Sequence, residues 1–531
     1  MTRLTPLLLS VSIVCLAGCQ GSADKIENVE PRNDSDTIVY PLYEDIKDWD
    51  PSTAFSTEVL VLANIYETLL RYDGSDKDEP IKPLLASRWE SQNQGKTWIF
   101  HLRQDVVFHD GEKLNAAAVK ASLNRTRELK RGPYYIWSAV SEIEVLDEYT
   151  VAIHTNEPTP IDLIAGAQYG AYIFSSKAAK QPSSWFQQGQ ASGTGPYRLA
   201  EWRPGSNIRL ERFDKYWDEH LANGFRRVRL PLIREISTQT QMIESGAADF
   251  VNPTPVNLLP RFKRIPGISV RTPASWVNQQ FLFNTDKYPT SEPAFRKALL
   301  HAWDNPSVIE YIYEGTAVAA AGAVPATMWG SDPSLTMPTF DLEKAKQLLV
   351  ESGVPKSAWR MRAAFVGSSS EYTNSMLLYQ HNLAQIGVTL ELSPGPWGRI
   401  WSEARNPASA PHIQSMMWWP TYPTPGDWLA GLFRTEASPL FNLAYYSNPE
   451  FDDLVNAGLA LEGQSRVQAS EKYRAAQQIL VDDAVAIFVA DLRLRTVHRS
   501  EIGGLKSNPA YSAVFFNQLY LKELEPAESQ P

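Results

Sequence analysis

The strongest constraint on the fold is the regular alternation of helix-like and strand-like segments after Pro273. Some of these segments repeat apolar residues at helical spacing, whereas others are short apolar runs typical of buried strands. Such alternation with short connections predicts an α/β fold with a largely parallel sheet. The expected helices are Ala294–Ala302, Leu342–Ser352 after the cap Asp341, Glu371–Ile386, Ile400–Arg405 and Arg466–Val481. The expected strands are Arg360–Val366, Val388–Leu392, Pro411–Met417 and Val485–Val489.

The region before Pro273 shows a looser mixture of strands and helices. The chain has 531 residues, too many for one ordinary hydrophobic core, so we expect two or three domains. Asn115 predicts the cap of a helix over Ala116–Leu129, and a second amphipathic helix is expected near Thr57–Leu70. The expected strands are Thr37–Leu42, Lys96–Leu102, Glu142–Leu146, Thr150–His154, Tyr197–Trp202 and Ser206–Arg212.

The N-terminus carries the pattern of an export signal. Arg3 supplies a positive charge, Leu4–Leu16 is apolar but too short to span a bilayer securely, and Leu16-Ala17-Gly18-Cys19 follows. This ending resembles the bacterial lipobox, in which cleavage before the cysteine is followed by lipidation of its sulfur. We therefore expect residues 1–18 to be a signal peptide, Cys19 to be lipidated, and residues 19–36 to be a flexible tether. The alternative is an ordinary secretory signal with an incidental cysteine.

Cysteine content and charge exclude several classes of protein. The chain has 2 cysteines, and Cys15 leaves with the signal peptide, so the exported protein has no internal disulfide and no cysteine-based metal site. The formal net charge is −10, without a long basic run. Neither nucleic acid nor an anionic membrane surface is therefore an expected partner.

The segment Met416–Phe433, with the sequence MMWWPTYPTPGDWLAGLF, combines aromatic residues with three prolines. Tryptophan and tyrosine need partners for their N–H and O–H groups when they are buried, so aliphatic residues would fill a core more simply. Because proline interrupts helices and interior strands, the sequence predicts a rigid loop after Met417. The loop would follow an expected strand, where α/β sheets place ligands. It is thus predicted to line a pocket or anchor an interface; the alternative is a surface loop that caps a core.

Catalytic motifs are absent from the sequence. Gly95-Lys96-Thr97 imitates the end of a P-loop, but Glu90 occupies the first glycine position and a strand follows instead of a helix. The 8 histidines form no HExxH motif, and no G-x-S-x-G motif exists. His101 and His109 could share a metal only with a third ligand that the pattern does not supply. We therefore predict no enzyme activity, no cofactor and no metal.

Several segments, in order along nearly the whole chain after the signal peptide, resemble the family 5 extracellular solute-binding proteins of bacterial ABC importers, of the dipeptide- and oligopeptide-binding type. The most specific is Gly95–Arg103 (GKTWIFHLR), continued by Val107–Gly111 (VFHDG). The others are Asn64–Leu70, Pro83–Glu90, Gly193–Tyr197 (GTGPY), Tyr216-Trp217, Phe283–Thr285, Phe295–Leu299 and Gly315. From the residues alone, GTGPY is read as a structural crossing between domains, since no helix with the phosphate-binding residues of a P-loop follows it.

The resemblance implies a three-domain clamshell of the periplasmic-binding-protein-like II type. Lobe I would combine residues 37–62, 190–275 and 490–531, domain II would be residues 63–189, and lobe III would be residues 276–489. A solute would lie between lobes I and III, which are joined by hinge strands, and would favour their closed arrangement.

The resemblance also assigns the aromatic segment as the ligand loop. Peptide-binding members carry W-x-x-D-Y-P-x-P there, and the aspartate pairs with the ammonium of the peptide. Thr421 occupies the acidic position in this chain, within Trp418-Trp419-Pro420-Thr421-Tyr422-Pro423-Thr424-Pro425. The predicted ligand-binding residues are Trp397, Trp418, Trp419, Thr421, Tyr422 and Asp427, the last as a replacement acid. Arg399 and Arg405 could meet an anionic ligand, although a surface role is the simpler interpretation.

The function implied is that of a monomeric, lipid-anchored periplasmic or cell-surface protein that delivers a solute to an ABC permease and its ATPase. Peptides and peptide-like solutes are the first class of substrate. Because a hydroxyl cannot neutralise a buried ammonium, we predict weak binding of ordinary di- and tripeptides. Blocked or modified peptides, opine-like conjugates and oligosaccharides that stack on Trp418 and Trp419 are the alternatives. A sensory receptor with the same fold is the alternative to a transport role.

Overall fold

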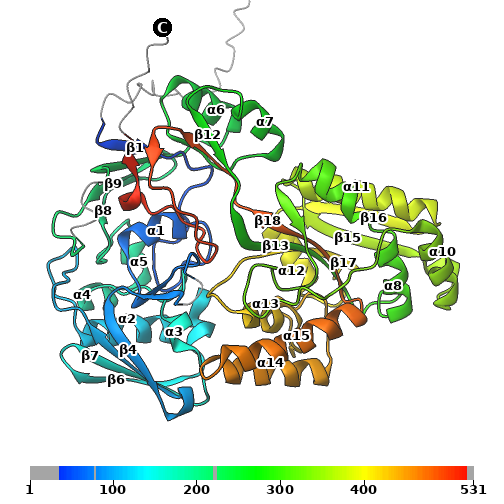
Figure 1. Cartoon of the computed structure of the whole chain (residues 1–531), viewed down its shortest axis with the longest axis horizontal. Coiled ribbons are helices and arrows are strands. Elements are labelled where there is room, and N and C mark those ends of the chain that lie inside the picture. Colours follow the sequence, from blue (N-terminus) through cyan, green and yellow to red (C-terminus); the bar gives the residue numbers. More distant parts are fainter. Residues whose placement is uncertain (1–34, 77–78, 219–223, 523–531) are drawn as a thin grey trace, which may run out of the picture.

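The computed structural model describes residues 35–76, 79–218 and 224–522, which form two bodies (Figure 1). The N-terminal body contains the described residues from 35 to 273, together with residues 494–522, which return to it from the C-terminal body. The C-terminal body contains residues 274–493. The predicted signal peptide, the predicted lipidation site Cys19 and most of the predicted tether lie outside the described residues.

Two four-stranded sheets organise the N-terminal body. One has the order β1 (Thr37–Val39), β10 (Arg227–Pro231), β9 (Asn207–Arg212), β8 (Tyr197–Arg203). The other has the order β4 (Ala86–Gln92), β5 (Thr97–Leu102), β7 (Thr150–Thr155), β6 (Val140–Asp147). A three-stranded sheet of β11 (Phe250–Val251), β19 (Thr496–Arg499) and β12 (Ile268–Arg271) contains a strand from the returning end of the chain. The remaining short strands are β2 (Leu70–Tyr72), β3 (Ile81–Pro83), β20 (Ile502–Gly503) and β21 (Tyr520–Leu521).

The helices of this body follow the predicted pattern in part. α2 spans Ala116–Leu129, and the side chain of Asn115 accepts the N–H of Ala118, which confirms the predicted cap. The helix expected over Thr57–Leu70 is shorter, because α1 ends at Ile65 and Leu70 begins β2. The other helices are α3 (Ile161–Ile164), α4 (Ser176–Ala179), α5 (Ser183–Phe186), α6 (Ile236–Ser245) and α7 (Leu259–Phe262).

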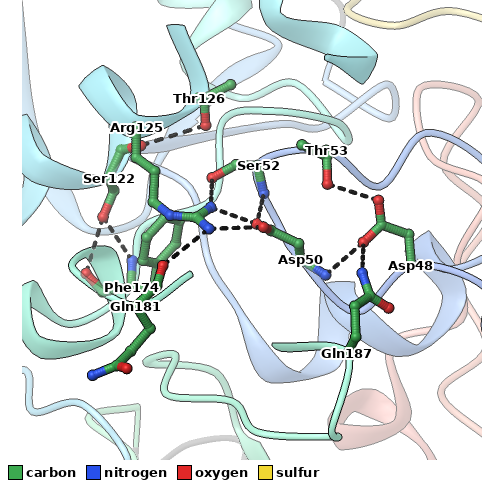
Figure 2. Close-up of polar contacts among 10 residues, drawn as sticks. All are labelled: Asp48, Asp50, Ser52, Thr53, Ser122, Arg125, Thr126, Phe174, Gln181 and Gln187. Carbon is green, nitrogen blue, oxygen red and sulfur yellow. Dashed lines mark hydrogen bonds and ion pairs between the residues drawn. The ribbon is translucent and has the colours of Figure 1, made fainter. Parts of the chain in front are cut away.

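A buried ion pair ties α2 to the segment before α1 (Figure 2). Both terminal nitrogens of Arg125 donate to the carboxylate of Asp50, at 2.6 and 2.8 Å, and one of them also donates to Ser52 at 2.9 Å. Asp50 is fully buried and Arg125 nearly so, and the guanidinium lies over the ring of Phe186. A bidentate, desolvated pair of this kind fixes the mutual orientation of the two segments.

The C-terminal body is built on a six-stranded sheet. Its order is β14 (Ala317–Ala319), β18 (Ala486–Arg493), β13 (Ala274–Phe283), β17 (Ile413–Trp418), β15 (Arg360–Val366), β16 (Thr389–Gly395). The expectation of a largely parallel sheet is wrong, because only β15–β16 and β15–β17 pair in parallel. β13 brings the chain into this body and β18 takes it back, so these neighbours run in opposite directions. The α/β class itself is confirmed.

Alternate residues of the central strands feed two cores. Phe281 and Ile487 face a core shared with α8 (Pro293–His301), α10 (Leu342–Glu351) and α11 (Ser370–Gln385). Leu282 and Phe488 face a core shared with α13 (Pro425–Phe433), α14 (Pro449–Glu462) and α15 (Arg466–Asp482). The helix α14 is not among those expected from the sequence pattern. The remaining short helices are α9 (Asn305–Ser307), which continues into a π-helical turn over Val308–Ile312, and α12 (Trp397–Ala404).

The predicted loop over the aromatic segment is only partly correct. The irregular stretch ends at Thr424, whose side chain caps α13 by accepting the N–H of Gly426 at 3.0 Å. Pro425 is compatible with this helix because it occupies the first turn, where its missing N–H has no intrahelical partner to lose.

Candidate functional site

The irregular segment between β17 and α13, residues 419–424, lies where the two bodies meet. The carbonyl of Pro420 accepts a 2.7 Å hydrogen bond from the side-chain amide of the buried Gln168 in the N-terminal body. Gln168 also accepts the N–H of Ser512 at 2.8 Å, so it joins the returning end of the chain to this segment. We call residues 419–424 the seam segment.

Thr421 is the central residue of the seam segment and is 2% exposed. Its hydroxyl forms a 2.8 Å hydrogen bond with the hydroxyl of Tyr135, which belongs to the N-terminal body. Its backbone N–H donates to Asp427 at 2.7 Å. Thr421 therefore bridges the two bodies with one group and is held by α13 with the other.

Asp427 is a buried carboxylate in the first turn of α13, behind the seam segment. Burial raises its pKa to about 7, and the hydrogen bond that it receives from Thr421 opposes this rise. Because the carboxylate accepts the N–H of Thr421, it fixes the path of the backbone. This contact places Asp427 in a supporting position for the seam segment.

Trp419 packs against the opposite body. It contacts a small apolar cluster formed by Val59 and Ala63 of α1 together with Tyr169. Tyr422 is half-buried and packs against the core around β5 and α2. Both aromatic side chains thus extend from the C-terminal body to the N-terminal body.

Trp418 and Trp428 have different surroundings. Trp418 ends β17 in the core of the C-terminal body, and its ring meets that of Phe441 edge-on, with 5.1 Å between centroids. Trp428 is fully buried in α13 and donates its indole N–H to Asn278 at 3.1 Å. These two tryptophans support the seam segment from behind.

Trp397 and its neighbouring arginines lie on α12. Trp397 is 37% exposed at the start of that helix. Arg399 pairs with Glu403 at 2.7 Å, and Arg405 donates to the carbonyl of Pro439 at 2.8 Å. The contacts of these arginines fit the surface interpretation.

The sequence pattern does not predict the residues of the N-terminal body that contact the seam segment, namely Tyr135, Gln168 and Tyr169. Tyr135 and Thr421 are 286 positions apart, and nothing in the local pattern of either segment indicates their contact. The available signal was compositional, since aromatic residues stand beside glycine in GPYYIW (132–137) and AQYGAY (167–172).

The two histidines considered for a metal site have separate surroundings. His109 hydrogen-bonds through Nε2 to the carbonyl of Gly195 at 2.9 Å, whereas His101 contacts Thr150 through Nδ1. Across residues 35–76, 79–218 and 224–522, no group of three or more His, Cys, Asp or Glu residues could hold a metal ion. Within the same ranges, no helix has the length and apolar character needed to cross a membrane.

Comparison with known proteins identifies relatives over most of the chain. The model of the bacterial extracellular solute-binding proteins, family 5 (middle region), matches residues 80–439. The glutathione-binding protein GsiB of Escherichia coli K12 is 27% identical over 469 residues, which cover 86% of this chain and 89% of GsiB.

Solved structures share the fold. The periplasmic binding protein DppA from Helicobacter pylori, solved with the peptide STSA, superposes with a TM-score of 0.78 at 24% identity, covering 92% of this chain and 98% of DppA. The binding protein AgaA from A. tumefaciens R10, solved with agropinic acid, has a TM-score of 0.75 at 22% identity, covering 92% of this chain and 99% of AgaA.

Proposed function

Because this chain belongs to the bacterial extracellular solute-binding proteins of family 5, we propose that it captures a peptide or peptide-like solute between its two bodies and delivers it to an ABC permease. The observation that carries the proposal is the seam segment, which connects both bodies through Thr421–Tyr135 and Pro420–Gln168. A solute that replaces or reinforces such contacts favours the closed arrangement of the bodies. The protein acts as a carrier and not as an enzyme.

The predicted three-domain clamshell is part of this proposal. Lobe I (37–62, 190–275, 490–531), domain II (63–189) and lobe III (276–489) move about the β13 and β18 connections. The sheet supports this arrangement, because β13 and β18 are adjacent strands that lead into and out of the C-terminal body. Two neighbouring connections allow a hinge motion without breaking either core.

We propose that Trp419, Thr421 and Tyr422 contact the solute directly. Their contacts across the seam support this role. Trp418 and Asp427 then act from behind by fixing the segment, and Trp397 on α12 is proposed as a further aromatic contact. Aromatic faces with a few fixed polar groups are typical of pockets that tolerate variable side chains.

The residues favour a peptide derivative as the solute. Its ammonium, if it has one, must be neutralised by a group other than Thr421. GsiB is named for glutathione, so glutathione is the first ligand to test. Isothermal titration should show weak or absent binding of alanylalanine and trialanine. Submicromolar binding of these simple peptides contradicts this part of the proposal. A structural relative holds agropinic acid, so conjugates of that kind form a second class to test, and oligosaccharides a third.

Mass spectrometry of the solute that co-purifies with the native protein tests the function itself. A peptide-like or conjugated molecule in about equimolar amount is the expected result. A protein that carries no solute and binds none of the three ligand classes contradicts the proposed function. Genes for a permease and an ATPase beside this one argue against the sensory alternative. Mass spectrometry of the mature N-terminus tests the lipid-anchored, periplasmic location: a diacylglyceryl group on Cys19 is expected, and a cleaved chain with an unmodified Cys19 contradicts it. We expect a monomer that binds no nucleic acid.

A further inference from the structure

Glu58 is a buried carboxylate at the start of α1, and it is 3% exposed. Its Oε2 atom has no hydrogen-bond partner among the described residues. A buried charged group without a partner is costly, so such a group in a native structure calls for an explanation. A ligand that supplies the missing contact is one such explanation.

The acidic neighbours of Glu58 make it more costly to keep its carboxylate ionised without a positively charged partner. Burial raises its pKa, and the nearby acidic residues Asp48 and Glu44 raise it further. Lys47 opposes this rise, but its ammonium pairs with Glu44 at 2.7 Å. The surroundings therefore favour the arrival of a further positive charge at Glu58.

Three other buried carboxylates near α1 and the seam segment already have hydrogen-bond partners. Asp50 has its bidentate partner Arg125. Glu67 accepts hydrogen bonds from three side chains, those of Thr194, Tyr216 and Trp217. Asp427 accepts the N–H of Thr421. Glu58 differs from these three because one of its oxygens is left without a donor. The Oε2 atom of Glu462 also lacks a donor, but the other oxygen of Glu462 accepts the hydroxyls of Thr424 and Tyr473.

Glu58 also lies next to the seam. It directly precedes Val59, which forms the apolar cluster with Tyr169 and Trp419. Burial is the main cause that raises the pKa of Tyr169, and the charge of Glu58 raises it further. The hydroxyl of Tyr169 donates to the carbonyl of Ser56 at 3.2 Å, which holds its ring beside the start of α1.

We propose that Glu58 binds a cationic group of the solute, a primary ammonium or a guanidinium, beside the rings of Tyr169 and Trp419. A carboxylate and aromatic faces are two protein groups that attract organic cations, and here Glu58 directly precedes the residue of α1 on which both rings pack. The inference rests on the proposed function in one respect, since it takes the seam to be the solute site. In this proposal the positive charge of the solute is recognised by Glu58 at the start of α1 and not by the neutral hydroxyl of Thr421.

The test uses a charged probe and a neutral one of similar shape, namely benzylammonium and benzyl alcohol. Benzylammonium should raise the Tm of the wild-type protein at millimolar concentration, and benzyl alcohol should not. Glu58→Gln, which keeps the shape of the side chain, should weaken benzylammonium binding at least tenfold. Glu44→Gln is the matched control, because Glu44 belongs to the same acidic group but pairs with Lys47, and it should change binding less than twofold.

Two results overturn the proposal: a wild-type protein whose Tm does not respond to benzylammonium, and a Glu58→Gln variant that binds it as tightly as the wild type. The co-purified solute distinguishes this failure from failure of the proposed function. If that solute binds the wild type and Glu58→Gln equally, the result supports solute capture and contradicts the role of Glu58. If no solute is found but benzylammonium binding depends on Glu58, the result supports the cation site and contradicts the transport role.

Discussion

At the scale of single residues, three buried acidic side chains have raised pKa values and hold neighbouring groups by hydrogen bonds. Asp427, Glu462 and Asp491 are each at least nine-tenths buried, and burial raises the pKa of each to about 7. Asp427 holds the backbone of Thr421, and Glu462 accepts the hydroxyls of Thr424 and Tyr473. Two of the three acids therefore support the residues around the seam segment, which links the order of this segment to pH.

The first prediction concerns the pH dependence of stability. Between the pKa of an unfolded aspartate, about 4, and about 7, the folded protein keeps a proton on Asp427 that the unfolded chain has lost. Stability should therefore fall as pH rises through this window, by about 1.4 kcal/mol per pH unit for each such acid. Denaturation with urea at a series of pH values should show Asp427→Asn with a slope smaller by that amount. An unchanged slope in this variant contradicts the assignment.

Two contacts between elements decide how the N-terminal body is assembled. The buried pair Asp50–Arg125 joins α2 to the segment before α1 (Figure 2). The run Gly193–Tyr197 passes the end of α1, where the N–H of Gly195 donates to the carbonyl of Ile65 at 2.9 Å. The structural reading of this run fits its close approach to a helix end.

Removing one partner of the buried pair should be strongly destabilising. Arg125→Met leaves the carboxylate of Asp50 buried without compensation, and we expect a loss of about 3–5 kcal/mol in the free energy of unfolding. The double variant Arg125→Met with Asp50→Asn removes both charges and should recover part of this loss. Urea denaturation of the two variants measures the difference. Equal losses in both would show that the charge of Asp50 is not the cause.

The glycine at the start of the GTGPY run should not tolerate a side chain. A Cβ atom at Gly193 would lie 2.0 Å from the carbonyl oxygen of Ile65, which is backbone and cannot move aside freely. Gly193→Ala should therefore cost about 1–3 kcal/mol. Gly398→Ala is the control, because that position lies in α12 with nothing within 4 Å, and it should gain up to about 1 kcal/mol. Thermal unfolding should give Tm shifts of opposite sign.

The two bodies are also connected away from the seam segment. Arg466, at the start of α15, pairs with Asp162 of α3 in the N-terminal body at 2.5 Å. The turn before α15 approaches the same region, since a Cβ at Gly463 would lie 3.0 Å from the carbonyl oxygen of Thr159. This second connection joins residues of the two bodies, so it belongs to their mutual arrangement and not to either core.

The prediction at the scale of the whole molecule concerns this ion pair. If the bodies close around a solute, Arg466→Gln should raise the Kd several-fold without altering the solute's own contacts. The reason is that a partly exposed pair contributes up to about 1 kcal/mol to the closed arrangement. Arg474→Gln is the control, because Arg474 lies on the same helix but donates to Ser331 within its own body. Isothermal titration with the co-purified solute measures both, and equal effects on the Kd contradict a role in closure.

The sequence by itself determined the α/β class, many of the helices and strands, and local features such as the caps at Asn115 and Asp341. These depend on residue spacing within a few turns, which one sequence displays directly. Only the tertiary structure decided that β13 and β18 run antiparallel and that Asp427 is held behind Thr421. It also brought Tyr135 to Thr421 and buried Glu58 directly before Val59, which packs against Tyr169 and Trp419. Such contacts join segments far apart in the chain, and long-range packing, not local spacing, selects them.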